Sequence, residues 1–450
     1  MDTKSASIDN SANVDDSTQQ INSGDQEITT NVKGMVEQLD HLDKSYFGKD
    51  RHKLIKQKIE EIIQLLDTKP IEFIQNKKEK ADLLYLRGKA LDYLPEYSKN
   101  SEDFLSKSIK LMPTKQEAWD ALGHVYWKKR DLASAKKCFE GSLEQNSNNK
   151  NALRHLSMVF RMIEEPNAEL KLAKYKESIA LATKAVGLDL SDSQSWYVLG
   201  NAHLTNFFAN NTSTDELTHA LKAYSQTERL QKEPNPDLYY NRATIFEYLE
   251  RYNEAVRDYL KAHQVDPNLQ ADQRAEKIIN FVIQANTLIH HKGKVKSNKL
   301  INMVKSVPQS LQQQVSFATN DEQKQKIMYN VVATSQLEAG ENRNVILSAK
   351  IVSHLPKEQD VPMCFLIVDF KYNFSVVSLY HTNKFINESI KPGDEILIKN
   401  PQIIHTSLEY RGKLYTYQTV KVPDITNVLI NSQPLIEKYS QCQLVTNTFT

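Results

Sequence analysis

Apolar positions along this chain follow two different periods. Up to about residue 300 they recur at three- and four-residue steps, as in Leu54, Ile55, Ile59 and Ile62, a spacing that places them on one face of an α-helix. Beyond about residue 326 they form short runs of β-branched and aromatic residues, separated by turn sequences such as PGD and RGK. The pattern therefore predicts a helical region followed by a smaller, strand-rich region.

The helical region repeats itself about every 34 residues. The clearest copies are residues 116–149 and 236–269. The first copy carries the spaced residues Trp119, Leu122, Gly123, Tyr126, Ala135 and Phe139. This spacing matches the tetratricopeptide repeat (TPR), in which small residues let two antiparallel helices approach and large residues fill the space between them. About five or six such repeats are expected.

Two repeats are longer than the others. The small residue of the first helix recurs after 34 positions from Gly123 to Ser157. It recurs after 43 positions from Ser157 to Gly200 and again from Gly200 to Ala243. These two repeats therefore carry nine extra residues each, which fall near EEPNAELKL and NFFANNTST, between the paired helices. A final amphipathic helix over about 273–291 is expected to cap the array.

The strand-rich region contains six predicted strands, at residues 327–335, 345–354, 362–370, 374–381, 394–399 and 414–422. Five or six strands in about 100 residues favour a small Greek-key barrel of the oligonucleotide/oligosaccharide-binding (OB) type. Another small β-barrel or a sandwich is the alternative. The fold class is thus an all-α TPR solenoid followed by an all-β, OB-fold-like domain.

These patterns divide the chain into five segments. They are a disordered acidic and polar tail at 1–33, a TPR domain with its capping helix at 34–302, a linker at 303–326, the OB-like domain at 327–435 and a flexible tail at 436–450.

Composition and motifs narrow the classes of function. Only 12 of the 450 residues are glycine, and no G-x-x-x-x-G-K-[ST], G-x-S-x-G or H-E-x-x-H motif occurs, so we expect no phosphate loop and no enzyme. The three cysteines are far apart, and the adjacent His290 and His291 point in different directions on a helix, so we expect neither a cofactor nor a metal site. The 57 basic residues balance the 56 acidic ones, and no apolar run is long enough for a membrane span.

The first helices of the repeats carry a candidate peptide-binding groove. TPR arrays bind extended peptides on the concave surface that these helices form. The register places two arginines, which suit bidentate binding of a carboxylate, and two acids, which suit a cationic group, with tyrosines and an asparagine between them. The candidates are Arg154, Arg161, Tyr197, Asn201, Asp237, Tyr240 and Glu247. The alternative is that these polar groups pair with one another or face water.

A second candidate surface is basic. No Asp or Glu occurs between Lys277 and Asn320, and lysines crowd into the segment HKGKVKSNK around Gly293. Lysine without arginine suits contact with a phosphate backbone, which positions a nucleic acid without reading its sequence. A solvated charge run is the alternative. The four lysines of the segment are Lys292, Lys294, Lys296 and Lys299.

Several segments resemble one family beyond the generic repeat, over about residues 80–435. EAWDALGHVYWKK, SWYVLGNAHL, KGKVKSNKL and YRGKLYTYQTVKV resemble the tetratricopeptide repeat protein 5 (Strap) family. The resemblance implies a non-enzymatic adaptor that binds the N-terminal Met-Arg-Glu-Ile/Cys peptide of nascent tubulin at the ribosome and, through a recruited decay factor, triggers decay of tubulin mRNA. It also implies that Arg161 and Asp237 act in the groove, and that the four lysines contact the ribosomal RNA backbone.

Two other functions stay open at this point. The same family is described as a nuclear, stress-responsive cofactor of p300 complexes, so the resemblance implies a place in both cytoplasm and nucleus. A TPR chaperone adaptor that binds a C-terminal Glu-Glu-Val-Asp is the other alternative, although Asp237 and Glu247 would repel such an acidic terminus.

Overall fold

The computed structural model describes residues 15–46, 50–210, 214–310, 329–355, 362–380 and 389–435. The chain forms two compact units. Of the described residues, those of 15–206 and 214–234 belong to the first unit, and those of 207–210 and 235–435 belong to the second. The second unit therefore contains both the last helical repeat and the sheet.

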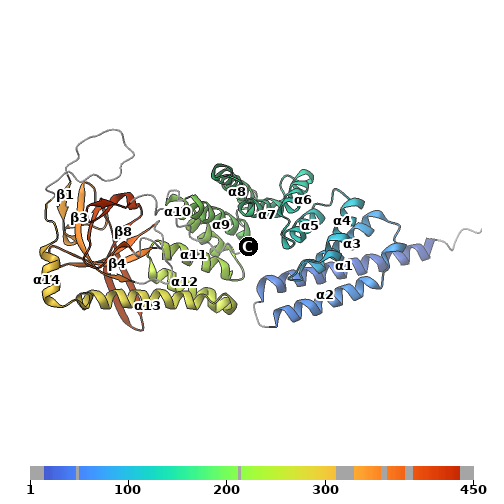
Figure 1. The fold of residues 1–450 in the computed structure, drawn as a ribbon. Helices are drawn as coiled ribbons and strands as arrows, with labels where there is room; N and C mark the ends of the chain where they lie inside the picture. The colour runs from blue at the N-terminus through green and yellow to red at the C-terminus, as the bar shows by residue number, and fades with distance from the viewer. Residues whose placement is uncertain are drawn as a thin grey trace, which may run out of the picture. The chain divides into compact units, whose positions relative to one another are not determined.

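Helices occupy the chain up to residue 305 in the order that the repeat predicts (Figure 1). Their bounds are α1 Asp15–Ser45, α2 Arg51–Asp67, α3 Lys77–Asp92, α4 Lys99–Leu111, α5 Gln116–Lys128, α6 Leu132–Gln145, α7 Lys150–Met162, α8 Ala168–Leu188, α9 Ser193–Asn210, α10 Asp215–Leu230, α11 Pro236–Tyr248, α12 Tyr252–Val265, α13 Ala271–His290 and α14 Ser297–Lys305. Five pairs, from α3 and α4 to α11 and α12, are the TPR helices, and α13 follows as the predicted cap. No helix along the described residues combines the length and apolar character that crossing a bilayer requires.

The small residue of each repeat is where the paired helices approach most closely. A Cβ atom on Gly123 would lie 2.6 Å from Cε1 of Phe139, and one on Gly200 would lie 2.6 Å from Cε1 of Tyr224. Ser157 takes the same position in the next repeat, where its hydroxyl donates a hydrogen bond to the carbonyl of Ser178 at 2.9 Å. The predicted register is therefore confirmed by the packing.

The nine extra residues of the two long repeats lengthen helices. α8 has 21 residues and α9 has 18, whereas α6 has 14 and α5 has 13. The inserted sequence therefore extends the paired helices as well as the connection between them.

The N-terminal segment differs from its prediction as a disordered tail. Residues 15–33 belong to α1, whereas residues 1–14 lie outside the described residues. Val32, Val36 and Leu39 are buried against α2 and α3. Their spacing forms an apolar stripe within an otherwise polar sequence, and average composition does not reveal such a stripe.

The strands form one mixed sheet (Figure 1). Their bounds are β1 Asn330–Val332, β2 Gly340–Glu341, β3 Val345–Leu355, β4 Met363–Asp369, β5 Phe374–Leu379, β6 Glu395–Lys399, β7 Gln402–Tyr410, β8 Lys413–Val422, β9 Val428–Ile430 and β10 Gln433–Pro434. The order is β10-β9-β6-β3-β4-β5-β8-β7-β2, and β1 pairs with β3. The neighbours β5 and β8 are parallel, whereas β3, β4 and β5 form an antiparallel meander.

The sheet is not closed into the barrel that the sequence predicts. Among the described strands, no ladder joins the two ends of the order given above. β6 and β7 are instead consecutive in the chain, and they pair with β3 and β8 respectively. Asn400, with a φ of 48°, and Pro401, which has no N–H to donate, form the connection between them. The covalent chain therefore joins two strands near opposite ends of the strand order that no ladder connects.

The predicted linker and C-terminal tail fall mostly outside the described residues. Residues 311–328 and 436–450 lie there, but residues 303–305 belong to α14 instead of a linker. Met303 and Val304 are buried, and α14 contacts β3. The start of the predicted linker is therefore part of the folded second unit.

Candidate functional site

Arg161 is the most distinctive of the predicted groove residues. It lies in the last turn of α7, half-buried, beside Tyr175, Tyr197 and Tyr224. Burial lowers the pKa of its guanidinium to about 10, while the three tyrosines oppose this shift. Within the described chain, no hydrogen bond or ion pair involves the Arg161 side chain. A guanidinium that is partly removed from water and has no acidic partner favours the binding of an acidic ligand.

Arg154 lies seven residues before Arg161 on α7, and its charge is already paired within the protein. Its Nη1 lies 2.6 Å from Oδ2 of Asp192, and its Nη2 also bonds the side chain of Asn151. Burial lowers the pKa of Arg154, and Asp192 opposes that shift. Of the two predicted arginines, Arg161 is therefore the one whose charge is not matched within the first unit.

The polar residues on α9 surround the same region of the first unit. The ring of Tyr197 lies 6.3 Å from that of Tyr224, centroid to centroid. The Tyr224 hydroxyl donates a hydrogen bond of 2.6 Å to Oδ1 of Asn201. Tyr197 and Asn201 therefore both lie beside Tyr224. Arg161 lies next to the Tyr197 and Tyr224 side chains.

Tyr175 and Tyr224 are the residues around Arg161 that the sequence analysis did not predict as part of the site. Both lie on second helices, α8 and α10, whereas the search for groove residues considered only first helices. Tyr224 occupies the position of Phe139 in its repeat, directly against Gly200. The signal was a tyrosine at a position where the repeat pattern carries phenylalanine.

In the second unit, Asp237 and Glu247 have different surroundings. Burial, and then the neighbouring charge of Asp266, raise the pKa of the half-buried Asp237, and no ion pair to its carboxylate occurs among the residues described. Glu247 instead accepts hydrogen bonds from the Tyr259 hydroxyl at 3.0 Å and from Arg274 at 3.1 Å. Asp237 is therefore the predicted acid with a charge still available.

Tyr240 lies near the ion pair that Glu247 forms with Arg274. Its ring packs edge-on against Tyr259, with centroids 5.2 Å apart and an interplanar angle of 73°. Its carbonyl accepts a hydrogen bond from Thr244. Tyr240 thus places a half-buried aromatic ring on α11, the first helix of the last repeat.

The four lysines of KGKVKSNK are exposed around a short 3-10 turn, η3 (Lys292–Lys294). Lys292, Gly293 and Lys294 all adopt positive φ angles, of 50°, 65° and 55°. A Cβ atom on Gly293 would lie 2.2 Å from Cγ1 of Val352, so this turn is seated directly on β3. No ion pair in the described part of the chain neutralises Lys292, Lys294, Lys296 or Lys299, and the fold therefore presents four unmatched positive charges close together.

Comparison with known proteins agrees with the division into a TPR array and a strand-rich domain. A family model described as the tetratricopeptide repeat protein 5 OB fold domain matches residues 328–443, and tetratricopeptide repeat models match residues 116–149 and 236–269. Tetratricopeptide repeat protein 5 of Mus musculus is 32% identical over 416 residues, which cover 90% of this chain and 92% of the mouse protein. The chain belongs to the tetratricopeptide repeat protein 5 family.

A second relative agrees with that assignment. Tetratricopeptide repeat protein 5 of Homo sapiens is 33% identical over 84% of this chain and 86% of the human protein. Among solved structures, a thermophilic TPR protein of Thermus thermophilus is 16% identical, with a TM-score of 0.37, over 44% of this chain and 98% of its own. As a member of the tetratricopeptide repeat protein 5 family with a TPR array, the chain is a TPR adaptor.

Proposed function

We propose that this adaptor binds the N-terminal Met-Arg-Glu-Ile/Cys peptide of nascent tubulin at the ribosome and thereby triggers decay of tubulin mRNA through a recruited decay factor. The proposal extends family membership to a specific ligand. It places the protein in the cytoplasm, with the nuclear role beside p300 complexes as the other function that the family suggests.

The observation that carries the proposal is the unmatched charge of Arg161. A peptide that begins Met-Arg-Glu offers one carboxylate, and Arg161 is a partly desolvated guanidinium that lacks an acid within the described chain. The planar guanidinium can bind that carboxylate through two parallel hydrogen bonds. The tyrosines beside Arg161 supply apolar area for the flanking part of the peptide.

The second unit offers groups for the rest of the assembly. Asp237 is an acid without an ion-pair partner among the described residues, and it suits the arginine of the peptide. The four exposed lysines around Gly293 suit the phosphates of ribosomal RNA. An acidic C-terminal Glu-Glu-Val-Asp ligand fits less well, because Asp237 would repel it.

The test is a titration of the full chain with a peptide that begins Met-Arg-Glu-Ile. Arg161→Ala is expected to weaken binding by at least about 2 kcal/mol, or about 30-fold, because it removes one partner of a charge pair formed in the groove. Arg154→Ala is the matched control on the same helix, since the Arg154 guanidinium is already paired with Asp192. Circular dichroism verifies that both variants are folded.

Changing the peptide separates the remaining outcomes. With glutamine at its third position, wild type should lose about as much affinity as Arg161→Ala loses with the original peptide, and the two changes together should add little more. If Arg161→Ala binds the original peptide as tightly as wild type, the peptide does not use this groove. If a peptide ending in Glu-Glu-Val-Asp binds more tightly, the chaperone-adaptor function replaces the one proposed.

A further inference from the structure

Three potential metal ligands meet where the second long repeat begins its extra residues. His203 lies on α9, seven residues before that helix ends, and Glu216 and His219 lie in the first turns of α10. Glu216 and His219 are three residues apart, so they share one face of the helix. The next residues along, Leu217 and Ala220, are buried, and this packing fixes the rotation of α10 about its axis.

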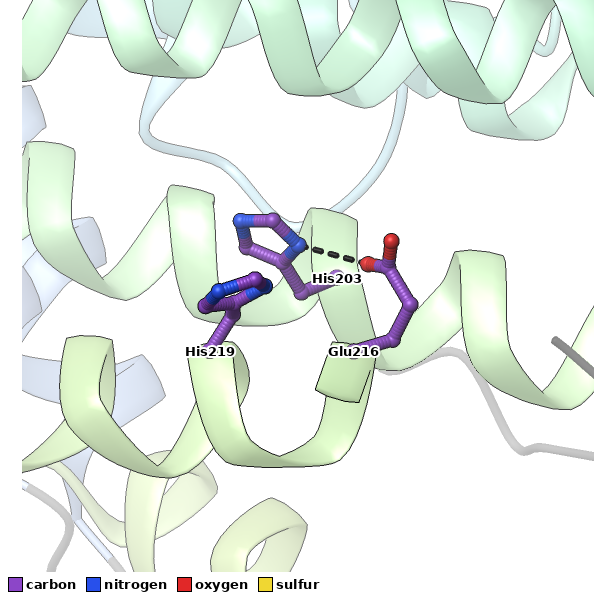
Figure 2. A group of neighbouring side chains, drawn as sticks. All are labelled: His203, Glu216 and His219. Carbon is purple, nitrogen blue, oxygen red and sulfur yellow. Dashed lines mark hydrogen bonds and ion pairs between the residues drawn. The ribbon is translucent and has the colours of Figure 1, made fainter. Parts of the chain in front are cut away.

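The three side chains converge in the structure (Figure 2). The Nδ1 atom of His203 lies 2.6 Å from Oε2 of Glu216. The rings of His203 and His219 are 5.1 Å apart, centroid to centroid. One ligand atom from each of the three residues lies within 4.8 Å of the other two.

These distances lie on either side of the ligand spacing in a tetrahedral metal centre. Zinc holds histidine nitrogen at about 2.0–2.1 Å and carboxylate oxygen at about 2.0–2.2 Å, so ligand atoms around it are about 3.3–3.5 Å apart. The exposed His219 can reach that separation by side-chain rotation, whereas His203 and Glu216, with side chains 14% and 23% exposed, are hydrogen-bonded at 2.6 Å and have to move apart by less than about 1 Å to admit the ion.

We propose that His203, Glu216 and His219 form a binding site for a divalent transition-metal ion such as Zn²⁺. Two imidazoles and one carboxylate are a ligand set that zinc uses with a fourth position left to water. The hard cations Mg²⁺ and Ca²⁺ prefer oxygen ligands throughout, so the two histidines select against them.

A metal at this position would tie α9 to α10 across the inserted segment. The connection between the two helices runs from residue 211 to residue 214, and residues 211–213 of it lie outside the described residues. A ligand that binds only the folded form stabilises it by mass action. Bound Zn²⁺ therefore raises the resistance of this repeat to unfolding.

The test is an isothermal titration of the metal-stripped full chain with Zn²⁺, followed by Co²⁺ as a spectroscopic substitute. His219→Ala and Glu216→Gln should each lower the affinity for Zn²⁺ by about 10- to 100-fold or more, since even the loss of an outer-shell partner has an effect of that size. The visible absorption of bound Co²⁺ should disappear with the same variants. His219 is exposed, so its replacement leaves the fold intact.

His263→Ala is the matched control. His263 also faces a carboxylate, with its Nδ1 3.2 Å from Oδ1 of Asp272, but it is not part of the three-residue cluster. The control should bind Zn²⁺ like wild type, and Mg²⁺ should give no binding heat with any variant. Equal Zn²⁺ affinity in wild type and His219→Ala would overturn the proposal, as would equal losses in His219→Ala and His263→Ala.

Discussion

At the scale of single residues, the half-buried His155 shows how a repeat array can hold a titratable group neutral. Its ring stacks on Phe139 at 5.0 Å and meets Trp127 edge-on. Its Nδ1 has no hydrogen-bond partner among the described residues. Burial, and then the nearby charges of His124 and Arg154, lower the pKa of His155 from 6.5 to about 3.

This pKa makes the first unit sensitive to acid. The unfolded chain takes up a proton on His155 below about pH 6.5, whereas the folded chain does not do so until about pH 3. Neutral His155 therefore has no effect on the free energy of unfolding above about pH 6.5, and this free energy falls as the pH drops from 6.5 towards 3. Between pH 7 and 5 wild type should lose about 1–2 kcal/mol more free energy of unfolding than His155→Phe, which keeps the aromatic stacking.

Tryptophan fluorescence measures this difference in the first unit, where His155 lies. All three tryptophans, Trp119, Trp127 and Trp196, lie in the first unit. Denaturant titrations at several pH values give the free energy of unfolding for each chain. Parallel pH profiles for wild type and His155→Phe would show that another group controls the acid response.

The roles of the two groove arginines also belong to this scale. The sequence places Arg154 and Arg161 on the same helix at similar repeat positions, and so it predicts both as candidates. What distinguishes them is Asp192, which lies 38 residues from Arg154 in the chain and neutralises only that arginine. A pairing of this kind depends on how α7 packs against the following helices, and spacing along one helix cannot reveal it.

At the scale of secondary-structure elements, the helices could be predicted better than the strands. The TPR pattern records local packing within about 34 residues, and so Gly123 and Phe139 identify two helices and their contact together. β7 was missed because it is not a continuous β-branched run. Its buried Ile403, Thr406 and Leu408 are mixed with the polar His405 and Glu409. Its place in the sheet comes from pairing with β8.

The turn that carries the lysines depends on one glycine for two reasons. Gly293 has a φ of 65°, which costs about 1–2 kcal/mol for a residue with a Cβ atom. Its Cβ position is also taken by Val352 on β3. Gly293→Ala should therefore destabilise the second unit and displace the lysine turn from the sheet.

Gly412→Ala separates the two causes. Gly412 has a similar φ of 71°, in the turn between β7 and β8, but nothing lies within 4 Å of its Cβ position. Gly293→Ala should cost about 1–3 kcal/mol more than Gly412→Ala, because only the former overpacks a core. The midpoints of thermal unfolding, followed by the near-ultraviolet circular dichroism of tyrosine, compare the two. Equal midpoints would mean that the turn is not held by its contact with Val352.

At the scale of the whole molecule, the last repeat and the sheet belong to one unit. The Tyr380 hydroxyl of the sheet domain donates to the carbonyl of Tyr248 at 2.9 Å and bonds the buried Glu250 at the same distance. Lys421 on β8 donates to the same carbonyl at 3.0 Å. The sequence divides the chain where the period of apolar residues changes, but these contacts join residues 130 or more positions apart, which no local pattern can reveal.

The second unit contains both Asp237 and the lysine turn, and the lysines can be replaced without changing any predicted groove residue. Replacing Lys292, Lys294, Lys296 and Lys299 with alanine should weaken ribosome binding without changing the affinity for the tubulin peptide. With four phosphate contacts, wild-type binding should fall on the order of 100-fold between 50 and 200 mM salt. The variant should bind more weakly at low salt and respond less to added salt.

A second set of four lysines provides the control for net charge. Lys53, Lys56, Lys77 and Lys78 are also exposed, but they lie in the first unit, and their replacement with alanine removes the same four charges. Co-sedimentation with ribosomes at both salt concentrations compares the variants, and peptide titration verifies that each groove is intact. Phosphate contact through the turn predicts loss only when the lysines around Gly293 are replaced. Equal losses from both sets would mean that the ribosome senses overall charge, and the turn would then be a solvated surface.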